Sequence, residues 1–280
     1  MKKFFLIIIL TLFVFESAHT NERYYFIRSS TCNNFFSNFK SDFQHFIGIG
    51  VQLFISPSQF HQDDLKRIGI IAGSTALLFL IDKDIRNFAQ SYQSKTNNRV
   101  FQLDNYYGNK YTFYLTLSTY VLGYFSRKEA VRETGLLSME AFLYSGFITN
   151  LLKVFIGRRR PNGGENHLVF KPFQFKTHYK SLPSGHSTVS FAVSTIMAKS
   201  WNNLFWKTFW YGSAAMVAVS RIYHNAHWIS DIFSGGMIGY SIAHFINKYN
   251  CEREDNLNIH SFQSFQIYIN GNKLGFILQF

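Results

Sequence analysis

A histidine and an aspartate that can act together lie in the segment SRIYHNAHWISD, residues 220–231. His227 and Asp231 are four residues apart, so on a helix they are neighbours on one face. The carboxylate would then fix the tautomer of the imidazole and leave its other nitrogen free to attack. Arg221 precedes His227 by six residues, which is off that face in a continuous helix, and a break near Asn225 would bring it back. A buried structural His–Asp pair is the alternative explanation for this cluster alone.

A second group of reactive residue types, Pro183-Ser184-Gly185-His186, stands directly before an apolar run that predicts a helix. Unpaired N–H groups in the first turn of that helix, together with the Ser184 hydroxyl, suit an oxyanion or a phosphate, and Gly185 allows the backbone to turn. His186 then stands at the mouth of this site, where it can protonate a leaving oxygen. The alternative is that Ser184 or Ser187 only caps the helix and that His186 is a surface residue.

Basic residues form the third group, KVFIGRRRP. Lys153 and Arg160 are seven residues apart, which is two turns of a helix and almost the same face, whereas Arg158 and Arg159 point elsewhere. Pro161 then ends the helix, because the residue before a proline is pushed out of the helical region. A helix end that carries basic residues to match its C-terminal dipole is the alternative.

The charge of the chain is concentrated in the same region. The formal net charge is +12, and residues 153–180 contain seven Lys and Arg side chains against one acid, Glu165. Such a patch suits nucleic acid, anionic lipid headgroups or a phosphate in a pocket, and a solvated basic loop is the alternative.

Helices must position these three groups. Aromatic residues make up 19% of the chain and only four prolines occur, which favours long helices with bulky apolar side chains. Residues 46–56 fit a strand or a short helix, and Asn270-Gly271 between two β-prone runs predicts a C-terminal hairpin. The steadier helical pattern predicts six helices, at 67–81, 112–125, 132–156, 187–199, 204–223 and 228–247.

The N-terminus has the features of a secretory signal peptide. A positive start precedes a run of 12 mostly apolar residues, 4–15, which is shorter than the roughly 20 residues that span a bilayer. We therefore expect cleavage near residue 18 and export, so that Cys32 and Cys251 can pair in an oxidising compartment. We expect four segments: a signal peptide at 1–18, an N-terminal extension at 19–65, a catalytic domain at 66–250 and a hairpin extension at 251–280.

Membrane crossing is less clearly indicated than the number of helices. The run 135–157 is long enough to cross a bilayer but contains Glu140, and the mean hydropathy of −0.04 is low for a protein with six spans. We expect membrane association, either integral or at the interface.

Together the three groups resemble the type-2 phosphatidic acid phosphatase and vanadium haloperoxidase superfamily, whose signature is K-x6-RP, then PSGH, then SR-x5-H-x3-D. Every defining position is matched here, from Lys153 to Pro161, from Pro183 to His186, and from Ser220 to Asp231. The resemblance implies an all-α fold with the six-helix bundle core of that family, to which the predicted hairpin is added.

The resemblance also implies a metal-independent phosphohydrolase that needs no cofactor. His227 would attack phosphorus to form a phosphohistidine, Asp231 would orient it, and His186 would protonate the departing alkoxide and then help to activate water. The developing charge would be held by the phosphate-binding residues Lys153, Arg160, Ser184, Gly185 and Arg221. The expected partner is a phosphorylated lipid, prenyl pyrophosphate or other phosphomonoester at the cell envelope, with the active site facing the periplasm and with no nucleic acid.

Four alternatives stay open at this point. A soluble, nonspecific periplasmic acid phosphatase is favoured by the leader and the low hydropathy, and a vanadium-dependent haloperoxidase would use the same pocket. A non-catalytic binder of anionic lipids would keep the cations but has no need of His186, His227 and Asp231 together. A zinc site at His224 and His227 lacks a further ligand cluster, and a metal ion would be repelled by the surrounding cations.

Overall fold

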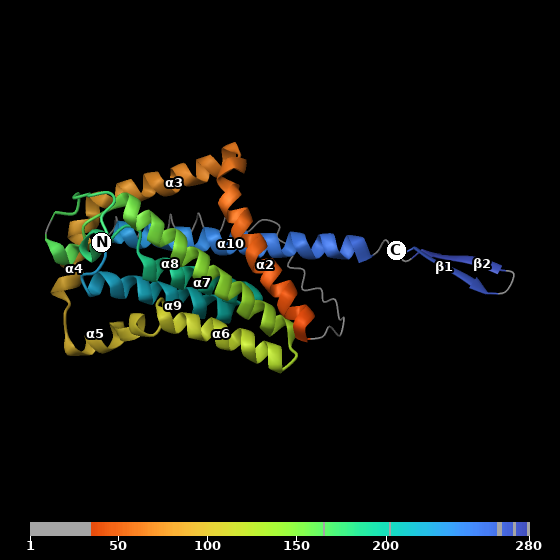
Figure 1. Cartoon of the computed structure of the whole chain (residues 1–280). Coiled ribbons are helices and arrows are strands. Elements are labelled where there is room, and N and C mark those ends of the chain that lie inside the picture. The colour runs from red at the N-terminus through yellow and green to blue at the C-terminus, as the bar shows by residue number, and fades with distance from the viewer. Residues whose placement is uncertain (1–34, 165, 202, 262–264, 271–272, 279–280) are drawn as a thin grey trace. The chain divides into compact units, whose positions relative to one another are not determined.

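The computed structural model describes residues 35–261, apart from 165 and 202, and two strands at 265–270 and 273–278 (Figure 1). The predicted signal peptide and Cys32 lie outside the described residues, so the cleavage and the pairing of Cys32 with Cys251 stay predictions. The chain divides into two units, Met1–Asn38 and Phe39–Phe280. The first unit is described only over residues 35–38, and the fold below is that of the second.

The described part of the chain contains nine α-helices. They are α2 (Phe35–Ile55), α3 (Gln62–Leu78), α4 (Asp82–Ser91), α5 (Lys95–Val100), α6 (Lys110–Phe125), α7 (Glu129–Ile156), α8 (Gly185–Ser200), α9 (Leu204–Tyr223) and α10 (Ile229–Ser261). All six predicted helices are present as α3 and α6–α10, although α10 continues well beyond residue 247. The segment 46–56 lies almost entirely in α2, and the short helices α4 and α5 were not predicted.

Helix α8 is the centre of the bundle and packs against α7, α9 and α10 (Figure 1). Small residues allow the close approach: a Cβ atom at Gly239 of α10 would collide with the backbone of Thr188 in α8. An apolar core then forms around α8, from Ile49, Leu137, Ala141, Ala192, Ile196, Ile242, Ala243 and Ile246. The N-terminal end of α8, which begins at the predicted phosphate-binding tetrad, is thereby held beside the start of α10, where the Ser184 N–H donates to the Asp231 carbonyl.

Helix α7 is the one described helix that is long and apolar enough to cross a membrane. Phe147 and Phe155 lie two turns apart on the same face of it, and 62% and 56% of their surfaces are exposed. Leu151 lies between them and is also exposed. Apolar side chains that are exposed along one face of a helix mark a surface for lipid or for another apolar partner.

Two short strands follow α10. Strand β1 (Phe265–Asn270) pairs antiparallel with β2 (Lys273–Leu278), in a register that runs from Phe265 opposite Leu278 to Asn270 opposite Lys273. The turn residues 271 and 272 are not among the described residues.

Candidate active site

His227 lies in the turn between α9 and α10, not on a helix. The break predicted near Asn225 is present: α9 ends at Tyr223, and Asn225 has a left-handed backbone with a φ of 53°. The prediction that His227 and Asp231 share one helix face is therefore wrong, because α10 begins only at Ile229. The turn nevertheless brings His227 Nδ1 to 3.6 Å from Asp231 Oδ2.

Asp231 is fully buried in the first turn of α10 and has several donors other than His227. Its Oδ2 accepts hydrogen bonds from the Ser181 hydroxyl at 2.5 Å and from the Trp228 backbone N–H at 2.9 Å. Its backbone carbonyl accepts the N–H of Ser184 at 2.8 Å, which ties the His–Asp turn to the tetrad. A separation of 3.6 Å to His227 Nδ1 is longer than a hydrogen bond, and such contacts in active sites without substrate often shorten when substrate binds.

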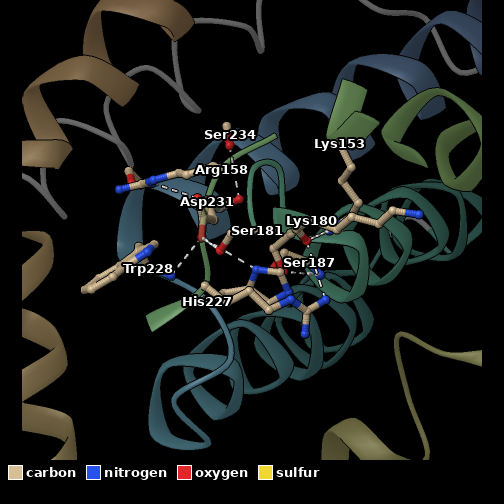
Figure 2. A network of polar contacts seen from close by, with 12 residues as sticks. Lys153, Arg158, Lys180, Ser181, Ser187, His227, Trp228, Asp231 and Ser234 are labelled. Atoms are coloured by element: carbon tan, nitrogen blue, oxygen red, sulfur yellow. Dashed lines mark hydrogen bonds and ion pairs between the residues drawn. The ribbon is translucent and has the colours of Figure 1, made fainter. Parts of the chain in front are cut away.

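Arg158 holds the other side of the Asp231 carboxylate (Figure 2). Its guanidinium donates to Asp231 Oδ1 at 2.7 Å and to Asp82 Oδ2 at 2.6 Å, and all three side chains are fully buried. It also donates to Ser230 Oγ at 2.6 Å, and it stacks 4.4 Å from the ring centroid of Phe79. Arg158 thus points away from Lys153, as predicted, but it points to the back of the His–Asp pair and not to solvent.

The tetrad begins helix α8 as predicted. Ser184 is the N-cap, and its hydroxyl accepts from the N–H and from the hydroxyl of Ser187, at 3.5 and 3.1 Å. Gly185 and His186 belong to the first turn, whose N–H groups have no acceptor within the helix and so suit an anion. Gly185 does not provide a special turn, because its φ is not positive. A Cβ atom there would instead lie 3.6 Å from Lys153 Cε, in the space beside these amides.

Lys153 and Arg160 do meet, but not on one helix. Helix α7 ends at Ile156, because Gly157 adopts a left-handed conformation with a φ of 63°, so Pro161 is not what ends it. The following loop folds back on itself: the Arg160 N–H donates to the His178 carbonyl at 2.8 Å. The two side chains converge on the Lys180 carbonyl, to which Lys153 Nζ donates at 2.9 Å and Arg160 Nη2 at 3.5 Å.

Arg221, in the last turn of α9, is the third cation of the site. Its Nη1 donates to Asp104 Oδ2 at 2.6 Å, and Asp104 is almost fully buried. Asp104 Oδ1 also lies 3.7 Å from Nε2 of His224, the residue that directly follows α9. The carboxylate fixes the guanidinium before any substrate arrives.

Burial and the neighbouring cations keep both histidines neutral. Burial, and then the Arg221 guanidinium, lowers the pKa of His186 to about 3. Burial, and then Lys153 and Arg160, lowers the pKa of His227 well below 6.5. A neutral imidazole has a free lone pair, so His227 is in the form that a nucleophile requires.

The structure thus brings together all eight predicted site residues, His227, His186, Asp231, Lys153, Arg160, Ser184, Gly185 and Arg221. It also adds residues that the sequence analysis missed, Arg158, Asp82, Ser181 and Asp104. Helical spacing directs Arg158 away from Lys153, but α7 ends at Ile156, so this spacing does not show where the Arg158 side chain points. The other three have no local motif, and their partners are 50 to 117 residues away.

All three groups of residues lie within a segment that matches a known family. A family model described as the PAP2 superfamily matches residues 134–254, which include all three. Over these residues the chain is similar to the PAP2 superfamily.

Two relatives of this chain are named as phosphatases. A lipid A 1-phosphatase of Porphyromonas gingivalis is 26% identical over 179 residues, which cover 62% of this chain and 36% of that protein. Lipid phosphate phosphatase 1 of Arabidopsis thaliana is 32% identical over 133 residues, which cover 38% of this chain and 41% of that protein. The chain therefore spans well under two thirds of the length of these relatives.

A solved structure supports the PAP2 fold. The transmembrane PAP2-type phosphatidylglycerolphosphate phosphatase of Bacillus subtilis superposes with a TM-score of 0.50, over 74% of this chain and 96% of that chain, at 18% identity. The predicted helical bundle is confirmed. The comparisons do not support the C-terminal hairpin as part of the PAP2 fold.

Proposed function

We propose that this chain is a phosphohydrolase that acts on a lipid phosphate without a metal ion or other cofactor. One observation carries the proposal: a neutral, buried imidazole faces three basic side chains beside the first turn of a helix. The cations are Lys153, Arg160 and Arg221, and each of them lowers the pKa of His227 through its charge. Such a pocket attracts a phosphate and repels a metal ion.

His227 would attack the phosphorus atom through Nε2, because Nδ1 is the nitrogen that faces Asp231. The P–O bond to the leaving alcohol breaks as the N–P bond forms, which produces a phosphohistidine. Asp231 would orient the ring and stabilise its positive charge. The cations and the α8 amides would bind the equatorial oxygens, and single donors of this kind are each worth about 3 kcal/mol in well-studied sites.

His186 would give its proton to the departing alkoxide. The imidazole is neutral in the empty site, and a bound phosphate dianion favours its protonated form, because nearby negative charge raises the pKa of a histidine. Neutral again after this transfer, His186 would accept a proton from the water that cleaves the N–P bond. Inorganic phosphate and the free enzyme are then restored.

The proposed substrate is a lipid phosphate. The names of the relatives support this class, and so do the exposed apolar side chains of α7, including Phe147 and Phe155. We further propose that the chain is associated with a membrane of the cell envelope, with the site on the periplasmic side, as the signal-peptide-like N-terminus suggests.

The test is phosphate release by purified protein in the presence of a chelator. The substrates are phosphatidic acid in mixed micelles and p-nitrophenyl phosphate, and the His227→Ala variant is measured beside the wild type. We expect release from phosphatidic acid, inhibition by vanadate, and loss of at least about a thousandfold in kcat in His227→Ala.

Three results would count against this function. Activity that is lost in chelator and restored by zinc would overturn the histidine mechanism. A preference for the small ester would favour a soluble acid phosphatase. If the wild type binds the lipid but hydrolyses none of the substrates, the result would favour a non-catalytic binder of anionic lipids.

A further inference from the structure

The loop between α7 and α8 contains cations and aromatic rings that the proposed reaction does not use. Phe173 and Phe175 have 65% and 77% of their surfaces exposed. Lys171 and Lys176 are also exposed, and neither forms an ion pair with an acid among the residues that the structure describes. Exposed rings beside such cations indicate a partner that is both apolar and negatively charged.

The backbone of this loop is held against the last turn of α7. The Lys171 N–H donates to the Gly157 carbonyl at 2.8 Å, and the Phe173 N–H donates to the Val154 carbonyl at 2.7 Å. The approach is close, since a Cβ atom at Gly157 would collide with the Lys171 carbonyl. Phe173 adopts a φ of 60°, a conformation that residues with a side chain seldom adopt. These contacts fix Lys171 and Phe173 at the end of α7.

The loop continues the exposed apolar face of α7. The ring centroid of Phe173 lies 5.5 Å from that of Phe155, and the two rings meet edge to face. Phe155 is the last of the exposed apolar residues of this face, after Phe147 and Leu151. The face therefore extends past the end of the helix to Phe173, with Lys171 two residues away. An apolar face that ends in rings and lysines suits a membrane interface, where the rings enter the acyl boundary and the ammonium groups meet the headgroups.

The same loop is joined to the phosphate-binding residues. The Lys180 carbonyl accepts a hydrogen bond from Lys153 Nζ at 2.9 Å. The Lys180 ammonium group lies 5.7 Å from the ring centroid of Phe175, and that of Lys171 lies 5.3 Å from the ring centroid of Tyr179. Contact with a ring face leaves the N–H donors of an ammonium group available to an anion. A surface bound by this loop would therefore lie next to the site.

We propose that residues 171–180, the docking loop, bind a bilayer surface that contains anionic lipids, and that such lipids stimulate hydrolysis without being substrates. Phe173 and Phe175 enter the interface, and Lys171 and Lys176 contact the negative headgroups. Charge complementarity makes the loop favour anionic over zwitterionic lipids. This inference rests on the proposed function and adds to it the surface that docks and the charge of the lipid that surrounds the substrate.

The first experiment varies the lipid around a fixed content of phosphatidic acid in mixed micelles. The added lipid is phosphatidylserine or phosphatidylcholine, and p-nitrophenyl phosphate is the reference substrate. We expect the ratio of kcat/KM for phosphatidic acid to kcat/KM for the small ester to rise with phosphatidylserine and not with phosphatidylcholine. In the double variant Lys171→Gln, Lys176→Gln this rise should be about tenfold smaller, since each lysine near an anionic surface strengthens binding about fivefold.

The matched control removes the same charge elsewhere. Lys66 in α3 and Lys248 in α10 are exposed lysines outside the loop, so Lys66→Gln, Lys248→Gln should keep the full rise. Equal losses in the two double variants would overturn the proposal, and so would equal stimulation of the wild type by both lipids.

The ring is tested by Phe173→Asn, because asparagine tolerates a left-handed backbone and the fold is not strained by the change. The ratio of kcat/KM for phosphatidic acid to kcat/KM for the small ester, measured with phosphatidylserine, should fall about fivefold. Phe125→Asn is the control, at an equally exposed ring just before the start of α7, and should leave the ratio unchanged. A ratio that is unchanged in Phe173→Asn would contradict the insertion of this ring.

A second measurement does not depend on activity. In Phe175→Trp, reconstituted in nanodiscs, the fluorescence gained over the wild type should be quenched more by phosphatidylserine than by phosphatidylcholine when either lipid is brominated in its acyl chains. Adding Lys171→Gln and Lys176→Gln should make the two lipids equal. Absence of quenching would overturn the docking loop even if hydrolysis is normal. Quenching as expected in a protein that hydrolyses no substrate would overturn the proposed function alone, which separates the two failures.

Discussion

Arg158 is the residue whose removal should harm the protein most outside the reacting groups. In Arg158→Met, two fully buried carboxylates, those of Asp82 and Asp231, lose the cation that lies 2.6 and 2.7 Å from them. Removing one partner of a buried ion pair costs about 3–5 kcal/mol. The stacking on Phe79 is also lost, but the methionine side chain keeps part of that contact. We expect the free energy of unfolding to fall by about 3–5 kcal/mol, a large share of the 5–15 kcal/mol of a typical domain.

The loss should depend on pH in a defined direction. Burial already raises the pKa of Asp82 above 3.8, and Arg158 and, to a smaller extent, Ser230 oppose that rise. Without Arg158 the folded-state pKa rises further, so the folded variant takes up a proton that the unfolded chain lacks in the window above 3.8. The destabilisation is therefore complete above the raised pKa and becomes smaller as the pH falls through it.

The assay is denaturant unfolding of the detergent-solubilised protein at pH 5 and pH 7.5. Asp82→Asn in the Arg158→Met background removes one of the two unpaired charges and should recover part of the loss. Arg159→Met is the control, because the Arg159 side chain donates to the Gly163 carbonyl and to no described carboxylate. A loss below about 1 kcal/mol in Arg158→Met, as for an exposed ion pair, would refute the reasoning, and so would a loss that does not respond to Asp82→Asn.

Two further predictions concern activity. Asp104→Asn should lower kcat/KM for phosphatidic acid by about ten- to a hundredfold, because Arg221 loses the carboxylate that positions it and small misplacements cost that much. Asp63→Asn, at an exposed carboxylate, is the control, and equal rates in the two variants would contradict the prediction. Arg160→Gln removes a cation that lowers the pKa of both His186 and His227. The acid limb of the pH profile of kcat/KM, measured from pH 3 to 8, should therefore move to higher pH. An acid limb that does not move would show that Arg160 does not act on these imidazoles.

The sequence by itself determined the local features of this protein. Apolar periodicity depends on residues within a few turns of one another, so the six predicted helices, including the one that follows the tetrad, could be found without a structure. The break near Asn225 could also be predicted from local geometry. Residues six positions apart lie on different faces of a continuous helix, so Arg221 could lie beside His227 only if the helix breaks between them. The motif residues also predicted a single site, and in the structure their side chains lie near one another.

Only the tertiary structure decided how the site is supported. The hydrogen bonds of Arg158 to Asp231 and Asp82 span 73 and 76 residues, and the bond of Arg221 to Asp104 spans 117. A buried charge needs a partner of opposite charge. The neighbouring sequence does not show which carboxylate lies beside it, because the packing of the helices determines which distant residues come into contact. The same holds for Arg160, which reaches Lys153 through the folded-back loop after Gly157 and not through a shared helix.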